Sequence, residues 1–112
     1  MTNKGYYLGE FEELVLLSAA SLTDHAYGVS IMKYIVDKTG RHVNISAVHE
    51  VLRRLEEKGY LKSKMGGATQ QRGGRRKRYF VLTISGRKTL EEAMKLKLQL
   101  YQGVPNFSFK PI

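Results

Sequence analysis

The densest chemical signal in the sequence is a run of cations beside a glycine-rich stretch. Five of the seven residues from 72 to 78 are basic, namely Arg72, Arg75, Arg76, Lys77 and Arg78. Guanidinium groups present planar sets of donors to phosphate oxygens, and glycines let backbone amides approach a ligand closely. The run therefore predicts contact with a polyanion. Nucleic acid is favoured over an anionic membrane, because no amphipathic basic helix accompanies the run.

A second set of polar residues lies at helical spacing between residues 46 and 58. Apolar residues recur there at i, i+3, i+4 and i+7, at positions Val48, Val51, Leu52 and Leu55. This pattern predicts a helix with one buried face and one polar face. Side chains near the start of such a helix reach base edges when the helix enters a major groove. The candidate base contacts are Ser46, Ala47, His49, Glu50 and Arg53.

Each candidate has a chemistry that suits a base or the backbone. Arg53 suits guanine, Glu50 suits the amino group of cytosine, and Ala47 suits the methyl group of thymine. An i,i+4 ion pair between Glu50 and Arg54 is an equally good interpretation of Glu50. For Arg54, an internal ion pair is favoured over a base contact. Tyr27 is expected to pack its ring in the core and to place its hydroxyl at the DNA backbone, alongside the five cations of the basic run.

The sequence offers little material for catalysis or metal binding. It contains no Cys, which excludes disulfides, thiolate zinc sites and cysteine nucleophiles. His25, His42 and His49 include no pair at the i,i+4 spacing of a helical metal site. Nucleophile motifs such as G-x-S-x-G are absent. We therefore expect no catalytic residue, no metal, no cofactor and no enzyme activity.

Length and composition indicate one small basic domain. The chain has 112 residues, 42% of them hydrophobic, and a net charge of +9. This mixture supports a buried core, although a domain of this size gains from association with a second subunit. No apolar run approaches the roughly 18 residues of a membrane-spanning helix, and the first residues lack a signal-peptide layout. The expected location is the cytoplasm.

The periodicity of the chain predicts a winged helix-turn-helix, mainly α with a small β-hairpin. Helices are expected at about 9–22, at 27–38 after a cap at Thr23 or Asp24, and at 46–58 with Ser46 as the cap. Alternating stretches at Leu61–Met65 and Arg78–Leu82 predict two strands around a projecting loop. A last helix should begin at Thr83 or Ser85 and end near residue 102. Gly40 and Gly59 are expected to end the second and third helices.

The first and last helices are too apolar for a monomer of this length. We expect them to form a homodimer interface made of Phe11, Leu14, Val15, Leu90, Met94, Leu98 and Tyr101. Lys97 falls inside this apolar arc, so it must reach the rim or meet a carboxylate of the first helix (Glu10, Glu12 or Glu13). The chain then divides into a DNA-binding domain at 1–84, a C-terminal dimerisation helix at 85–102 and a tail at 103–112.

Three segments together resemble the PadR-like family of transcriptional regulators. They are His-Ala-Tyr-Gly-Val at 25–29, Leu-Arg-Arg-Leu-Glu-Glu-Lys-Gly-Tyr-Leu at 52–61, and Gly-Arg-Arg-Lys-Arg-Tyr-Phe-Val-Leu-Thr at 74–83. The short chain with one C-terminal helix is similar to the family's small subgroup. The resemblance implies a dimeric prokaryotic regulator that binds double-stranded DNA, often a repressor, and in some members released by a small-molecule effector.

The sequence departs from the family pattern at two places. Val48-His49 stands where the family usually has Leu-Tyr, so His49 is expected to take over the contact of that tyrosine with DNA. The chain has no Trp and only Tyr101 as an aromatic residue on the last helix, which does not support multidrug sensing. An alternative function is an RNA- or protein-binding module without operator specificity, because Tyr79 and Phe80 alternate on a strand and one of them could be exposed for stacking.

Overall fold

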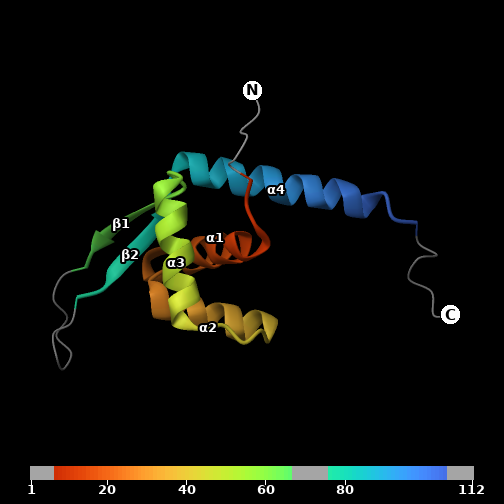
Figure 1. Ribbon diagram of the computed structural model, residues 1–112. Coiled ribbons are helices and arrows are strands. Elements are labelled where there is room, and N and C mark those ends of the chain that lie inside the picture. The colour runs from red at the N-terminus through yellow and green to blue at the C-terminus, as the bar shows by residue number, and fades with distance from the viewer. Residues whose placement is uncertain (1–6, 67–75, 106–112) are drawn as a thin grey trace.

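The computed structural model describes residues 7–66 and 76–105, which form three helices, a hairpin and a long final helix (Figure 1). The elements are α1 (Glu10–Leu22), a short 3-10 turn η1 (Thr23–His25), α2 (Gly28–Thr39), α3 (Ile45–Glu57), β1 (Leu61–Met65), β2 (Arg78–Leu82) and α4 (Ile84–Gln102). This order confirms the predicted winged helix-turn-helix with a C-terminal helix. Gly40 and Gly59 follow α2 and α3 with positive φ angles of 71° and 82°, as their predicted role at helix ends requires.

Two of the predicted helix caps are wrong, and in each case another side chain makes the capping hydrogen bond. Asn44, rather than Ser46, caps α3, because its side-chain oxygen accepts from the Ala47 amide at 2.8 Å. At the start of α2, the Ser30 hydroxyl accepts from the Tyr27 amide at 2.9 Å, and the residues expected to cap that helix form η1 instead. Thr83 caps α4 as predicted, accepting from the Gly86 amide at 2.9 Å.

The core lies where α1, α2 and α3 pack together against the root of the hairpin. Its largest fully buried side chains come from α1, α2, α3 and β1, and they include Leu16, Ile31, Ile35, Leu52, Leu55 and Leu61. Two residues expected at a dimer interface belong to this core instead. Val15 is completely buried and Leu90 is 7% exposed within a single chain. The apolar width of α1 therefore reflects burial against its own chain on several sides, which leaves these two side chains nothing to offer a partner.

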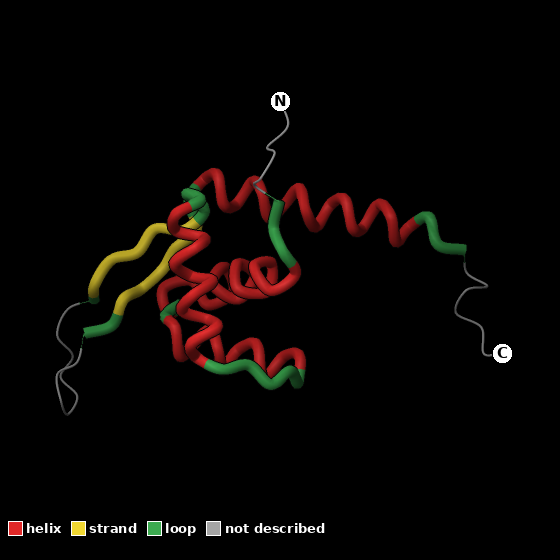
Figure 2. The backbone as a smooth tube through the Cα atoms, viewed as in Figure 1, coloured by secondary structure: helices red, strands yellow, loops and turns green. Residues whose placement is uncertain are grey.

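The hairpin is a two-stranded antiparallel ribbon in which Leu61 pairs with Leu82 and Met65 with Arg78. Phe80 turns inward and is buried, while the Phe80 amide donates to the carbonyl of Ala26 at 2.9 Å. This bond attaches β2 to the segment between η1 and α2. The ribbon therefore has a fixed position beside α3 and projects away from the helices (Figure 2).

The final helix begins in close contact with the hairpin and ends far from the body of the molecule (Figure 1). A Cβ atom at Gly86 would overlap the carbonyl of Tyr60, so only glycine allows this approach. The distal half of α4 carries exposed apolar side chains, at Leu96, Leu98, Leu100 and Tyr101. Within the described residues, no helix has the length and apolarity needed to cross a membrane.

Candidate nucleic-acid interface

An open groove runs between α3 and the hairpin, on the face where the sequence predicts DNA contact. Its volume is about 720 Å³. The groove is lined from α3 by His49, Leu52, Arg53 and Glu56, and from the start of α2 by Tyr27, Gly28 and Val29. The hairpin contributes Arg78 and Phe80 of β2, together with Arg76 and Lys77 just before that strand. Residues from both predicted contact classes, base and backbone, thus border one surface.

The exposed face of α3 carries four of the five candidate base contacts. Ser46, His49, Glu50 and Arg53 are exposed, and Ala47 is half-buried. The opposite face is buried from Val48 to Leu55, as the apolar spacing predicts. The polar face is therefore free to meet a ligand without unfolding any part of the core.

His49 is held by the close packing of α2 against α3. A Cβ atom at Gly28 would overlap the imidazole ring of His49, and the side chain of Ile45 lies 3.5 Å from the same point. A glycine at position 28 therefore lets the two helices approach closely enough for the ring to rest on the α2 backbone. The imidazole is placed by this contact while it stays exposed to the groove.

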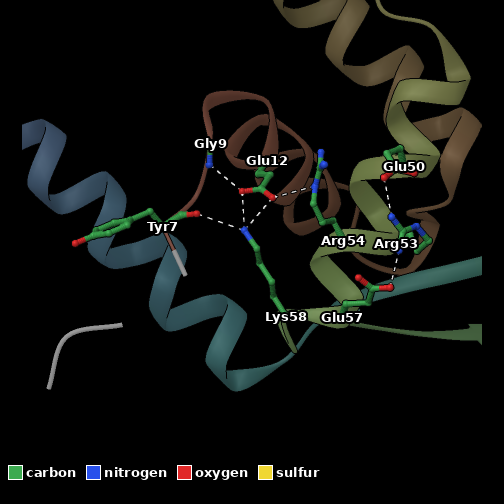
Figure 3. Close-up of polar contacts among 8 residues, drawn as sticks. All are labelled: Tyr7, Gly9, Glu12, Glu50, Arg53, Arg54, Glu57 and Lys58. Carbon is green, nitrogen blue, oxygen red and sulfur yellow. Dashed lines mark hydrogen bonds and ion pairs between the residues drawn. The ribbon is translucent and has the colours of Figure 1, made fainter. Parts of the chain in front are cut away.

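Arg53 lies between two carboxylates on the outer face of α3 (Figure 3). Its Nη2 donates to Glu50 Oε2 at 2.7 Å, and its Nη1 donates to Glu57 Oε2 at 2.5 Å. The hydrogen bond from Arg53 and its positive charge lower the pKa of Glu50 below the ordinary value. The sequence suggests an ion pair between Glu50 and Arg54. That interpretation names the wrong arginine, because Glu50 pairs with Arg53. The i,i+3 spacing, rather than i,i+4, brings the two charged groups together.

Arg54 and Lys58 point away from the groove, toward α1. Both reach Glu12, with Lys58 Nζ at 3.0 Å and Arg54 Nε at 3.5 Å from Glu12 Oε2 (Figure 3). This confirms the internal ion pair expected for Arg54. Burial alone would raise the pKa of Glu12, but hydrogen bonds from the Gly9 amide and Lys58, together with the two nearby cations, lower it overall. The pairing therefore ties the end of α3 to the first turn of α1.

A small aromatic and cationic cluster lies between the start of α2 and the start of β2. The rings of Tyr27 and Tyr79 meet edge to face, with centroids 5.4 Å apart. Lys77 Nζ lies 4.2 Å from the centre of the Tyr27 ring, which is a cation–π distance. Arg76 Nε donates to the carbonyl of Gly66 at 3.0 Å. These contacts hold the described cations of the basic run beside the groove. Arg72 and Arg75, predicted to contact the backbone, lie outside the described residues.

A chain of hydrogen bonds connects the hairpin to α3. Arg78 Nη1 donates to Ser63 Oγ at 3.0 Å, and Ser63 Oγ donates to Glu56 Oε2 at 2.7 Å. The hairpin and the helix therefore keep a defined separation across the groove. Among the described residues, no group of three His, Cys, Asp or Glu is arranged to hold a metal ion.

The decisive comparison is a match to a family model over most of the fold. Residues 16–92 match the transcriptional regulator PadR-like family. This range runs from α1 through the hairpin into α4 and includes both sides of the groove. The chain belongs to the PadR-like family. It is therefore a DNA-binding regulator of transcription, and members of its family are regulators rather than enzymes.

Solved structures of transcriptional regulators agree with this assignment. A PadR family transcriptional regulator from Eggerthella lenta is 26% identical, with a TM-score of 0.66 over 91% of this chain and 88% of that chain. A transcriptional regulator from Clostridium thermocellum is 27% identical, with a TM-score of 0.66 over 89% and 91%. A PadR-like regulator from Bacillus cereus shares the fold at 16% identity, with a TM-score of 0.72 over 90% and 93%. No match is found among curated proteins.

Sequence reasoning missed three participants in this PadR-like interface. Glu57 holds Arg53, Ser63 connects the hairpin to α3, and Tyr79 supports Tyr27. The i,i+4 spacing of Arg53 and Glu57 was visible in the sequence and marks a helical ion pair. The other two contacts depend on how the hairpin packs, so no local spacing indicates them.

Proposed function

We propose that this PadR-like chain is a homodimeric, sequence-specific repressor that inserts α3 into the major groove and lays the hairpin on the phosphate backbone. The observation that carries the proposal is the groove itself. The polar face of α3 and the cations of the hairpin border it from opposite sides, so one DNA duplex can meet base-reading and phosphate-binding groups together.

The first half of α3 supplies the proposed base contacts. Helix-turn-helix proteins read bases with the N-terminal part of the recognition helix, where Ser46, Ala47, His49 and Glu50 lie. Arg53 follows one turn later and suits guanine, whose O6 and N7 accept two parallel hydrogen bonds. His49 is proposed to take the place of the family's usual tyrosine, because its ring lies exposed on the groove side of α3.

Positive charge without any acidic residue is concentrated in the hairpin segment. Between residues 61 and 78 the sequence has seven Lys and Arg and no Asp or Glu. The described members Arg76, Lys77 and Arg78 line the groove, and we assign Arg72, Arg75 and Tyr27 to the same backbone contact. Phosphate contacts of this kind provide affinity without sequence information.

The proposed dimer forms through the distal half of α4. Leu98 and Tyr101 are 54% and 60% exposed, which is a large apolar area to leave in water. Met94 lies one turn before Leu98 on α4, and Met94, Phe11 and Leu14 are partly buried against the core. We assign these three residues to the same proposed interface. The Lys97 ammonium donates to Glu13 Oε2 at 2.8 Å. Lys97 thus meets a carboxylate of α1, one of the two arrangements expected for a cation beside this apolar face. A two-fold pairing through this surface gives two copies of α3 at a fixed separation.

The aromatic residues of the hairpin do not favour the RNA-binding alternative. Phe80 is buried in the core, and Tyr79 is half-buried with its ring against Tyr27. RNA-binding sheets present such rings to solvent so that unpaired bases stack on them. Neither ring is presented openly to solvent in this way, which favours duplex DNA as the partner.

Selection of bound duplexes from a random pool, followed by footprinting, tests the proposal. We expect a pseudo-palindrome whose half-sites are about 10 base pairs apart, or a multiple of that distance, because a two-fold dimer repeats along one face of the duplex. Promoter fusions to a reporter then test repression. Enrichment of no sequence, or preference for single-stranded RNA over duplex DNA, would contradict the proposal.

A further inference from the structure

The cations in the second half of α3 and at its C-cap fall into two groups that face opposite sides of the helix. Arg54 and Lys58 are engaged by Glu12 of α1 and do not border the groove. Arg53 does border it, and its two ion pairs come from the same helix, one turn before and one turn after (Figure 3). Within α3, Arg53 is thus the cation presented to DNA.

The carboxylates around Arg53 are unusual for a surface that meets DNA. Glu50 and Glu57 are both more than half exposed, on a face that must approach a polyanion. Each carboxylate would repel a phosphate oxygen placed beside Arg53. A neutral base edge meets no such repulsion, because it carries dipoles rather than a net charge.

The two ion pairs leave part of the guanidinium available. A guanidinium has five N–H donors, and the structure engages two of them, one on each terminal nitrogen. The rest have no partner among the described residues and suffice for the two acceptors of guanine. Arg53 therefore keeps its reading capacity while its terminal nitrogens are held in place.

The geometry points to Glu57 as a specificity-determining residue of this regulator. It acts by holding Arg53, with Glu50, so that the guanidinium meets a base edge and is denied to phosphates. The hairpin already supplies sequence-independent affinity, so a free arginine on α3 would raise binding to every sequence alike. This inference rests on the proposed DNA-reading role of α3. Glu57 is a positioning residue in it, since its own carboxylate needs no contact with DNA.

Replacement of Glu57 by Gln tests the inference, because the amide keeps the shape and removes the charge. We expect Glu57→Gln to bind random duplex about 3- to 10-fold more tightly and to gain little on the selected sequence, so that the ratio of the two affinities falls. The slope of log K against log salt for random duplex should become more negative by about 0.9, the value of one added phosphate contact. The control is Glu92→Gln on α4, which makes the same charge change at an exposed position outside the groove.

The Arg53→Ala background separates positioning from simple repulsion. If Glu57 acts through Arg53, the additional change Glu57→Gln should leave both affinities of Arg53→Ala unaltered. An equal gain on random duplex in both backgrounds would mean that Glu57 merely repels DNA, and it would overturn the inference. So would a Glu57→Gln protein with the wild-type affinity ratio and salt slope.

Two further measurements distinguish failure of the inference from unfolding of a variant and from failure of the proposed function. Thermal melting of each variant shows that the fold is intact, which exposed substitutions of this kind should preserve. The wild-type affinity ratio is measured beside the variants. If wild type binds all duplexes equally, the proposed function fails and the inference fails with it; if wild type discriminates and Glu57→Gln does so equally well, the inference alone fails.

Discussion

Glu12 is the residue whose environment has the clearest consequence for stability. Its carboxylate is nearly buried and accepts hydrogen bonds from the Gly9 amide at 2.8 Å and from Lys58 Nζ at 3.0 and 3.1 Å. The folded protein therefore favours the ionised form, and the pKa of Glu12 lies below its ordinary value. A depressed carboxyl pKa contributes stability above the unfolded-state pKa and loses it as the pH falls through the folded-state pKa.

Glu12→Gln should accordingly lower the free energy of unfolding at neutral pH. It should also make that free energy depend less on pH in the acidic range. We expect a loss of about 1–3 kcal/mol at pH 7, because Lys58 is left without its buried carboxylate partner. Between about pH 5 and pH 3 the gap from wild type should narrow, as the wild-type carboxyl takes up its proton. Urea unfolding at several pH values measures this; a constant gap across the range would contradict the assignment.

Arg53 carries the sharpest prediction for recognition. Arg53→Ala should weaken binding to the selected duplex by about 1–3 kcal/mol and relax the preference at one base position. The salt slope should change little, because the wild-type guanidinium is held by Glu50 and Glu57 rather than by phosphates. Titrations against single-base variants of the site provide the test. A uniform loss on random DNA would place Arg53 among the backbone contacts.

At the scale of elements, the hairpin places positive charge on one side of α3. Its register, its bond to Ala26 and its connection to Glu56 all fix where β2 lies. Its cations do not depend on the local conformation of α3, because they come from a separate element. Affinity and base reading should therefore respond to different substitutions.

Replacing Arg75, Arg76 and Lys77 together by Ala should weaken binding to all duplexes alike. The slope of log K against log salt should become shallower by about 0.9 for each phosphate contact that is lost. Arg87, Lys88 and Lys95 of α4, which are exposed and do not line the groove, provide a charge-matched control set. A triple variant that keeps its salt slope, or that loses affinity for one sequence only, would show that the hairpin does not bind phosphates.

At the scale of the whole molecule, α4 sets the distance between the two copies of α3 in the proposed dimer. Two apolar faces run along its distal half. One continues from Leu90 and Met94 to Leu98 and Tyr101, and the other carries Leu96 and Leu100 about half a turn away. The first face is continuous with the core, so a partner helix that packs there extends an existing apolar surface.

Leu98→Asp should separate the dimer and reduce DNA affinity with it, because it places an unpaired charge in the proposed interface. Leu98 is exposed in a single chain, so the fold should tolerate the change, whereas Met94 is partly buried against its own core. Leu100→Asp on the other face is the matched control and should dissociate the dimer less. Sedimentation velocity at micromolar concentration, beside a gel-shift titration, measures both effects. A monomeric wild type, or a Leu98→Asp dimer with full affinity, would defeat the proposed interface.

The sequence by itself determined the elements and their order. Helical spacing in α3, alternation in the two strands and glycines at 40 and 59 all depend on neighbours within a few residues, so they are visible along the chain. The three motifs likewise sufficed to indicate the family that the comparison confirms. The exposed polar face of α3 followed from the same periodicity.

Only the tertiary structure decided which partner each of two adjacent, similar residues contacts. Arg53 and Arg54 are adjacent and chemically identical, yet one meets carboxylates of its own helix and the other meets Glu12, 42 positions earlier in the numbering. Val15 matched the expected interface pattern, but the packing of three helices buries it completely. A side chain's partner depends on where its Cβ vector points after elements distant in sequence have packed, and local spacing carries no information about that direction.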